Sequence, residues 1–284
     1  MDTAHRTRQD PPPGPLSAGT VSAGTRVGTI AFLNCHPIRW GLARQPQAFD
    51  LVTGSPGDLA RQLLTGRLDV GPVSLLDYLE HADQLVLVPD LAIGSDGPVQ
   101  SCVLASSLPL AELGGRRVLL SRLSRTTVLL ARIYLEEVVG VRPDYATAGQ
   151  GAASVIIGDE ALRLTATAPA GRTIYDIGTI WQQWTGLPMV FAVWAARREF
   201  ATKCPDALRQ VRRALAAALD DAGRDPSAVV AAAVPASGGL GTSALAAYFQ
   251  TLDYSFGERQ KTAVQVFAKF AATRHPIAME YCLD

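Results

Sequence analysis

The sequence has no net charge. Its 284 residues contain 26 lysines and arginines and 26 aspartates and glutamates, so the formal charge at pH 7 is zero. Proteins that bind nucleic acid or anionic lipid through a long-range field carry clustered positive charge, and the basic residues here are not clustered. We therefore expect neither nucleic acid nor a membrane among the partners, and any preference for anions has to be local.

Cysteine and histidine are scarce as well. The four cysteines, Cys35, Cys102, Cys204 and Cys282, lie far apart without a CxxC pair, and the four histidines are isolated from one another. Structural zinc sites and disulfide frameworks need closely and regularly spaced ligands. The sequence thus predicts reduced, mostly structural thiols and no metal site.

Long apolar runs and nucleotide motifs are also missing. No window approaches 18 uninterrupted apolar residues, and the start of the chain has no apolar run typical of a secretory leader. No glycine-rich segment matches a dinucleotide fingerprint or a Walker loop. Residues 1–25, rich in Pro, Gly and Ser, are expected to form a disordered tail, and the protein is expected in the cytoplasm.

What the sequence does contain is a regular alternation of short apolar runs and amphipathic stretches. Hydrophobic residues make up 48% of the chain, and the runs at residues 27–33, 68–74 and 85–88 are each followed or preceded by a helical pattern. Repeated units of this kind predict an α/β fold with a mainly parallel sheet. The region beyond Pro205 is helical in pattern and is expected to pack against the first lobe.

A chain of this length exceeds the usual size of one domain, so two lobes are expected. Gly114 and Gly115 interrupt the pattern before a second series of strands and helices begins. We expect lobe 1 to contain residues 26–112 and 197–284, and lobe 2 to contain residues 113–196.

Candidate ligand-binding residues follow the predicted strands, because ligands of open α/β sheets bind beyond the carboxyl ends of the strands. Nearly all of them are neutral groups that form hydrogen bonds. They are Asn34, Ser74, Ser101, residues 121–127, and the pair Gly158 and Asp159.

The segment Ser124-Arg125-Thr126-Thr127 precedes an apolar helix. Hydroxyl groups and free N–H groups at a helix start form a site for a carboxylate or phosphate. Simple capping of the helix by serine or threonine is the alternative. Arg125 either adds a contact to a carboxylate or faces solvent.

Two further places suggest acid–base chemistry. Cys35 and His36 are neighbours, but adjacent side chains of an extended segment point to opposite sides and do not readily form a nucleophile–base pair. Asp159 follows a predicted strand and is a candidate base. Its alternatives are to cap the following helix or to pair across the hinge between the lobes.

Four segments, in the same order along residues 26–194, resemble one family. They are residues 28–37, 66–74, 158–162 and 184–192. Together they are similar to the chorismate dehydratases of the futalosine route to menaquinone. The resemblance implies a two-lobed, periplasmic-binding-protein-like (type II) fold with a ligand cleft between the lobes.

The reaction that the resemblance implies removes water from chorismate to give 3-[(1-carboxyvinyl)oxy]benzoate, with no metal or organic cofactor. On this basis Asn34 and Ser101 are expected to be catalytic, near the reacting ring and the departing hydroxyl group. Substrate binding is expected from Ser74, Thr126, Thr127, Gly158 and Asp159. The proton acceptor is either Asp159 or the enolpyruvyl carboxylate of the substrate itself, and the oligomeric state stays open.

Three other functions are compatible with some of these features, and the sequence favours none of them. A solute-binding protein of a transporter has the same architecture, but no export signal or anchoring cysteine precedes Cys35. The sister enzyme, 1,4-dihydroxy-6-naphthoate synthase, usually opens with a Ser-Pro-Cys-Pro-Asn-Asp-like segment, where this chain has Phe-Leu-Asn-Cys-His-Pro at residues 32–37. A regulatory effector domain lacks support because no helix-turn-helix segment is evident.

Overall fold

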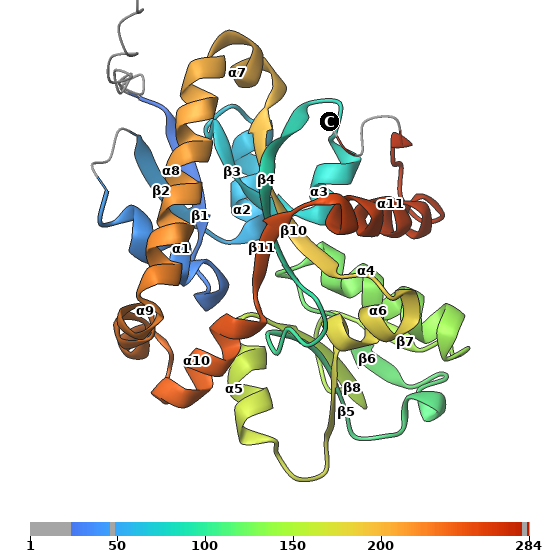
Figure 1. Ribbon diagram of the computed structural model, residues 1–284. Coiled ribbons are helices and arrows are strands. Elements are labelled where there is room, and N and C mark those ends of the chain that lie inside the picture. Colours follow the sequence, from blue (N-terminus) through green and yellow to red (C-terminus); the bar gives the residue numbers. More distant parts are fainter. Residues whose placement is uncertain (1–23, 46–48, 280–282, 284) are drawn as a thin grey trace, which may run out of the picture.

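The structure is a computed structural model that describes residues 24–45, 49–279 and 283. These residues form two β-sheets, each flanked by helices (Figure 1). In the described ranges no helix has the length and apolar character needed to cross a membrane. The expected tail at residues 1–25 lies outside the described residues, except for Gly24 and Thr25.

The first sheet has six strands in the order β11-β4-β10-β3-β1-β2. Their bounds are β1 (Arg26–Ile30), β2 (Asp50–Gly54), β3 (Val70–Ser74), β4 (Leu85–Ser95), β10 (Met189–Arg197) and β11 (Asp253–Phe256). Strand β1 is parallel to β2 and β3, whereas β10 is antiparallel to β3 and β4 and β11 is antiparallel to β4. Strand β10 is buried over its whole length except for its last residue, as expected of a central strand that is covered on both faces.

The second sheet has five strands in the order β7-β6-β8-β5-β9. Their bounds are β5 (Cys102–Ser106), β6 (Arg117–Leu119), β7 (Asp144–Ala146), β8 (Ala153–Ile157) and β9 (Thr173–Asp176). Strand β6 is parallel to β7 and β8, and β5 is antiparallel to β8 and β9.

The expectation of a mainly parallel sheet is wrong. Within the described part of the chain, four strand pairs are parallel and five are antiparallel. The difference arises where the chain moves between the sheets: β4 leaves the first sheet and β10 returns to it, so the two lie side by side in opposite directions. Local βα units predict only the crossovers within one sheet.

The chain changes sheets at two places that differ from the expected lobe boundaries. It leaves the first sheet between Ser95 and Cys102 and returns between Asp176 and Met189. Strand β5 therefore pairs in the second sheet, and β10 in the first, although residues 26–112 and 113–196 were expected to form separate lobes. We propose residues 96–101 and 177–188 as the boundaries between the lobes.

Helices cover both sheets (Figure 1). Around the first sheet and in the C-terminal region lie α1 (His36–Leu42), α2 (Pro56–Leu64), α3 (Leu75–Glu80), α7 (Arg198–Lys203), α8 (Pro205–Arg224), α9 (Pro226–Ala233), α10 (Thr242–Thr251) and α11 (Glu258–Ala272). The second sheet carries α4 (Arg125–Ile133), continued by a π-helical turn at Tyr134–Val138, together with α5 (Asp159–Thr167) and α6 (Ile177–Thr185). Short 3-10 turns lie at Leu33–Cys35, Leu110–Glu112 and Val234–Ala236.

Helix α1 is held closely against α8. A β-carbon at Gly41 would lie 2.1 Å from the carbonyl oxygen of Ala218, so only glycine permits this approach. The contact fixes α1, and with it the Leu33–Cys35 turn that leads into this helix.

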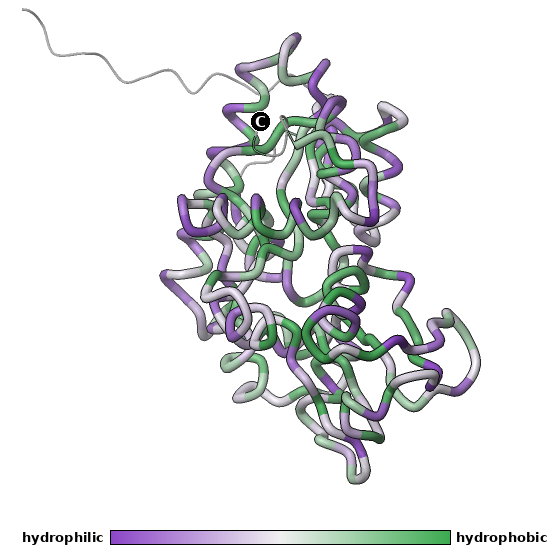
Figure 2. Tube along the Cα trace, turned by 90° about the vertical axis from the view of Figure 1, so that its right-hand side faces the viewer, coloured by the Kyte–Doolittle hydropathy of each residue, from purple (hydrophilic) through white to green (hydrophobic). Residues whose placement is uncertain are grey.

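A separate hydrophobic cluster joins this turn to the C-terminal region. It contains Leu33, Leu162 of α5, Val230 of α9, and Leu245 and Tyr248 of α10. Burying each large apolar side chain contributes about 1.5–3 kcal/mol, so this cluster is a substantial link between α5 and the first lobe. Figure 2 shows the general pattern, with hydrophobic positions along the inside of the molecule and hydrophilic ones on the outer bends.

Candidate active site between the two sheets

A small cavity of about 40 Å³ lies between the two sheets. Its walls come from the ends of β1, β3, β5 and β8, from β10, and from the segments that follow these strands. Its lining residues are Ile30, Phe32, Asn34, Pro56, Ser74, Ser101, Cys102, Ser124, Ile157, Gly158, Phe191 and Ala192. None of these twelve carries a formal charge, so the cavity offers amide, hydroxyl and apolar groups to a ligand.

The floor of the cavity, residues 32–34, is held by two side chains from elsewhere in the chain. The Arg39 guanidinium donates hydrogen bonds to the carbonyl oxygens of Ile30 and Phe32, the latter at 3.0 Å. The Tyr254 hydroxyl donates to the carbonyl oxygen of Asn34 at 2.6 Å. These two side chains, neither of which lines the cavity, therefore fix the backbone around Asn34.

The side chain of Asn34 keeps one group unused. Its Oδ1 atom is buried and has no hydrogen-bond partner among the residues that the structure describes. A buried acceptor without a partner costs about 1–3 kcal/mol. A donor on a ligand in the cavity would recover this free energy.

Ser101 lies at the point where the chain crosses to the second sheet. Its side chain is almost completely buried, and its Oγ atom accepts a hydrogen bond of 3.1 Å from the Tyr248 hydroxyl. The preceding residue, Gln100, has a φ of 60°, a left-handed conformation that is costly for a residue with a side chain. The Asp176 carboxylate stabilises this bend by accepting the N–H groups of Val99 and Gln100.

Two serines that start helices also line the cavity. Ser74 caps α3, where its Oγ accepts the Asp77 N–H at 3.2 Å and donates to the Asp77 carboxylate at 2.7 Å. Ser124 caps α4 by accepting the Thr127 N–H at 3.3 Å. The positive end of the α4 dipole thus faces a neutral cavity, which favours an anionic group there.

Thr126 and Thr127 lie behind this surface and do not line the cavity. Both are fully buried. The Thr126 Oγ1 accepts the Leu76 N–H at 3.0 Å, and the Thr127 Oγ1 lies 3.0 Å from Ser124 Oγ and 3.5 Å from the Cys102 Sγ. Both hydroxyls are therefore bonded to protein groups in this conformation, and capping by Ser124 is what the structure shows at this helix start.

Arg125 contacts carboxylates, but they belong to helix α3 of the other lobe and not to a ligand, so the side chain bridges the lobes. It pairs with Asp77 at 2.7 Å and with Glu80, both on α3. Its pKa is raised by these carboxylates, first by Glu80, so the guanidinium stays charged.

Gly158 lines the cavity, but its N–H group is already used. It donates to the carbonyl oxygen of Ser101 at 2.7 Å. Its φ of 70° favours glycine, and a β-carbon here would lie 3.3 Å from the ring of Phe32. The glycine therefore permits the second lobe to approach the floor closely.

The Asp159 side chain bonds to the backbone of the floor and does not itself line the cavity. Its Oδ1 accepts the N–H of Leu33 at 2.9 Å, a bond that joins α5 to the turn after β1. Burial raises the pKa of Asp159, although the Leu33 N–H and the charges of Arg163 and Arg39 oppose this shift. Of the alternatives for Asp159, pairing across the hinge between the lobes matches this contact. Asp159 is not among the residues that line the cavity.

A family model described as "Menaquinone biosynthesis" matches residues 25–273. The chain belongs to this menaquinone biosynthesis family. A curated chorismate dehydratase of Thermus thermophilus is 33% identical to it over an alignment of 210 residues that covers 66% of this chain and 76% of that relative.

Solved structures similar to this member of the menaquinone biosynthesis family establish its fold. A protein of Archaeoglobus fulgidus has a TM-score of 0.73 and 16% identity, covering 89% of this chain and 98% of its own. The alkanesulfonate-binding protein SsuA of Xanthomonas axonopodis pv. citri, bound to MOPS, has a TM-score of 0.66 and 16% identity, covering 92% and 97%. The expected two-lobed, periplasmic-binding-protein-like fold is thereby confirmed, and at such identities these likenesses concern the fold alone.

The thiols near the cavity of this menaquinone biosynthesis protein are protonated at neutral pH. Burial raises the pKa of Cys102 to about 12 and that of Cys35 to about 11. Cys204 is also a free thiol, and Cys282 lies outside the described residues. His36 stacks on the ring of Phe249, with 6.1 Å between ring centroids, and its pKa is lowered by burial and by Arg39.

Three residues that shape the site were missed by sequence reasoning. Tyr248 is 147 positions away from Ser101, and Tyr254 is 220 positions away from Asn34. Both lie in the region that was expected only to pack against the first lobe, and no local pattern distinguishes them from core tyrosines. Arg39 lies in α1 near the floor, but a single arginine in a short helix gives no sign that it bonds to the preceding loop.

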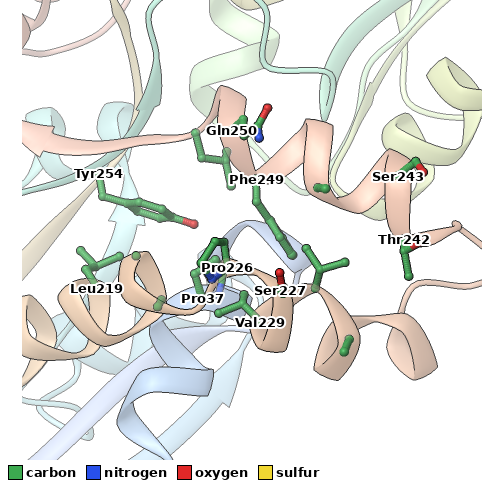
Figure 3. A pocket seen from close by; sticks show the side chains of 16 residues that line it. Pro37, Leu219, Pro226, Ser227, Val229, Thr242, Ser243, Phe249, Gln250 and Tyr254 are labelled. Atoms are coloured by element: carbon green, nitrogen blue, oxygen red, sulfur yellow. The ribbon is translucent and has the colours of Figure 1, made fainter.

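A second hollow, of about 720 Å³, lies between α8 and α9 on one side and α10 on the other (Figure 3). Phe249 and Tyr254 extend into it toward Pro226 and Val229. Its lining is mostly apolar, and none of the seven predicted site residues belongs to it. Among the described residues, no group of three or more His, Cys, Asp or Glu side chains is arranged to hold a metal ion.

Proposed function

We propose that this protein is a chorismate dehydratase, a hydro-lyase that eliminates water from chorismate to give 3-[(1-carboxyvinyl)oxy]benzoate. Membership of the menaquinone biosynthesis family and the 33% identical chorismate dehydratase support the proposal. The observation that carries it is a neutral cavity between the lobes, in which Asn34 and Ser101 converge and a buried amide oxygen lacks a partner within the described chain.

The elimination requires little from the protein, because aromatisation of the ring favours the product. One ring hydrogen leaves as a proton, one C–O bond breaks, and the hydroxyl group departs with a proton as water. In the proposal Ser101 donates a hydrogen bond to the departing hydroxyl group, and Asn34 orients the ring through its amide. Such groups act by positioning the substrate and by stabilising charge that develops in the transition state.

The substrate carries two carboxylates, and the start of α4 is the proposed site for one of them. Ser124 reaches the cavity there, and N–H groups in the first turn of a helix have no partner within the helix. Thr126 and Thr127 belong to the same turn, and Ser74 provides a second hydroxyl opposite it. No part of this arrangement calls for a metal or an organic cofactor, and we place the activity in the cytoplasm.

The proposed proton acceptor is the enolpyruvyl carboxylate of the substrate. The residues that line the cavity include no carboxylate, imidazole or amine, and the Cys102 thiol is protonated at neutral pH. Asp159 is the protein alternative, but its Oδ1 accepts the Leu33 N–H and its side chain faces the floor. A substrate carboxylate that lies beside the ring needs no further base.

The lobes have to separate before chorismate can bind. Ligand pockets usually enclose about 300–1,000 Å³, and this cavity encloses about 40 Å³. Opening breaks the bonds between the lobes, which include Leu33 N–H to Asp159 and Leu76 N–H to Thr126. Closure over the substrate then excludes water from the reacting ring.

The direct test is to incubate the purified protein with chorismate and to follow 3-[(1-carboxyvinyl)oxy]benzoate by mass spectrometry. We expect the product to accumulate with wild-type protein and to form far more slowly with Ser101→Ala. The likeness to the alkanesulfonate-binding protein favours one other candidate, a binding protein without catalysis. Stabilisation of the fold by chorismate without any product would establish that candidate and refute the dehydratase.

A further inference from the structure

Tyr248 stands directly behind Ser101 and outside the cavity. It lies on α10, its side chain is 1% exposed, and its hydroxyl is 3.1 Å from the Ser101 Oγ. Its ring is fixed by Phe249, with 5.6 Å between ring centroids, and by Leu33 and Leu245 in the same hydrophobic cluster. A tyrosine in this position touches the substrate only through the serine.

The Tyr248 hydroxyl is the donor in this hydrogen bond, and burial keeps it protonated. A buried phenol resists ionisation, and burial raises the pKa of Tyr248 well above its ordinary value. The phenol therefore stays neutral, and in the structure its O–H group donates the hydrogen bond to the Ser101 Oγ.

This bond determines which hydrogen bond the Ser101 hydroxyl can still form. A serine hydroxyl has one hydrogen to donate. With Tyr248 donating to its oxygen, Ser101 is left as a donor, and the partners within reach are the Cys102 thiol and a ligand in the cavity. A thiol is a weak acceptor, so an oxygen of the substrate displaces it.

We propose that Tyr248 is a positioning residue that polarises Ser101 and directs the serine proton toward the hydroxyl group that leaves the substrate. The chain of donors runs from the Tyr248 hydroxyl to the Ser101 hydroxyl and on to the departing oxygen, and each bond in such a chain strengthens the next. The inference rests on the proposed function, because it assigns Ser101 a role in that reaction.

The experiment is a double-mutant cycle in the full chain with chorismate as substrate. The proteins compared are wild type, Ser101→Ala, Tyr248→Phe and the double variant, and kcat, KM and the thermal midpoint are measured for each. Tyr248→Phe keeps the ring in the core and removes one hydroxyl. We expect it to lower kcat about tenfold, the effect of one hydrogen bond, with KM nearly unchanged. In the Ser101→Ala background the same substitution should cause no further loss of kcat, because its target is gone.

A matched control comes from the second buried tyrosine. Tyr254→Phe also removes one hydroxyl, but this hydroxyl bonds to the Asn34 carbonyl oxygen and not to Ser101. Its effect on kcat should therefore persist in the Ser101→Ala background, where that of Tyr248→Phe disappears.

The experiment distinguishes failure of the Tyr248 inference from failure of the proposed dehydratase function. If Tyr248→Phe lowers kcat by the same factor in both backgrounds, or changes only the thermal midpoint, the inference is overturned while the dehydratase assignment stands. If wild-type protein forms no product from chorismate, the proposed function itself is refuted.

Discussion

The cavity between the sheets and the hollow beside α10 differ both in volume and in the chemistry of their linings. The hollow beside α10 encloses about 720 Å³ and is mostly apolar, whereas the cavity between the sheets encloses about 40 Å³. Only the small one combines Asn34, Ser74, Ser101 and Ser124 from both lobes. The convergence of polar groups from both lobes is why we propose the smaller cavity as the site, and its small volume reflects lobes that meet over it.

Helix α10 contributes residues to the surroundings of both the cavity and the larger hollow. Successive residues of a helix point about 100° apart. Phe249 lines the larger hollow, while the preceding residue, Tyr248, bonds to Ser101 at the cavity. A helix that the sequence presents as simple packing thus supports the candidate site from behind.

The largest expected effect comes from Asn34→Ala. Removing one well-placed polar group from such a site costs roughly a hundredfold to a thousandfold in rate. Because the Oδ1 of Asn34 has no partner among the described residues, its loss breaks no protein hydrogen bond at that atom, and the thermal midpoint should stay near that of wild type. Steady-state kinetics and thermal unfolding check both statements. A kcat within threefold of wild type would remove Asn34, and the small cavity, from the reaction.

The intermediate effect is expected at Asp159. Loss of a general base costs roughly a hundredfold to ten-thousandfold. We expect Asp159→Asn to keep kcat within about tenfold of wild type, because an amide oxygen still accepts the Leu33 N–H. A larger fall in kcat, in a variant that folds normally, would restore Asp159 as the base. Asp159→Ala is the companion variant, and it should lower stability because the Leu33 N–H loses its partner.

The pH dependence of stability tests the same residue. Burial raises the pKa of Asp159 above its ordinary value of 3.8, so the folded protein binds this proton more tightly than the unfolded chain does. The stabilising contribution is therefore fully present below pH 3.8 and is lost as the pH rises through the folded-state pKa. Asp159→Asn cannot ionise, so its thermal midpoint at pH 7 should equal or exceed that of wild type, and the difference should shrink in acid. A variant less stable than wild type at pH 7, with an unchanged difference in acid, would contradict this.

The smallest effect is expected in the larger hollow. Thr242→Ala removes an exposed hydroxyl from its lining, and surface substitutions of this kind usually change stability by less than about 0.5 kcal/mol. Both kcat and KM for chorismate should stay within twofold of wild type. A tenfold change in either would show that the two hollows are coupled, and that the comparison between them is too simple.

Sequence reasoning predicted the parts of this protein that depend on neighbouring residues. Ser55 caps α2 and Gly66 adopts a positive φ after it, as the local pattern indicated. Polar residues after the strands were expected near a ligand, and Asn34, Ser74, Ser101 and Gly158 do line one cavity. These features follow from chain direction and local conformation, which short sequence patterns encode.

The tertiary structure alone decided which distant groups meet. Strand β10 is a continuous apolar run, and such a run does not reveal that it returns to the first sheet between β3 and β4. The bonds from Tyr248 to Ser101, from Tyr254 to Asn34 and from Leu33 to Asp159 join residues more than a hundred positions apart. The sequence by itself determined the strands, the helix starts and the family motifs, because each depends on a few adjacent residues. Which hydroxyl reaches the cavity and which carboxylate faces away from it depend on how the lobes pack, and that is a property of the whole chain.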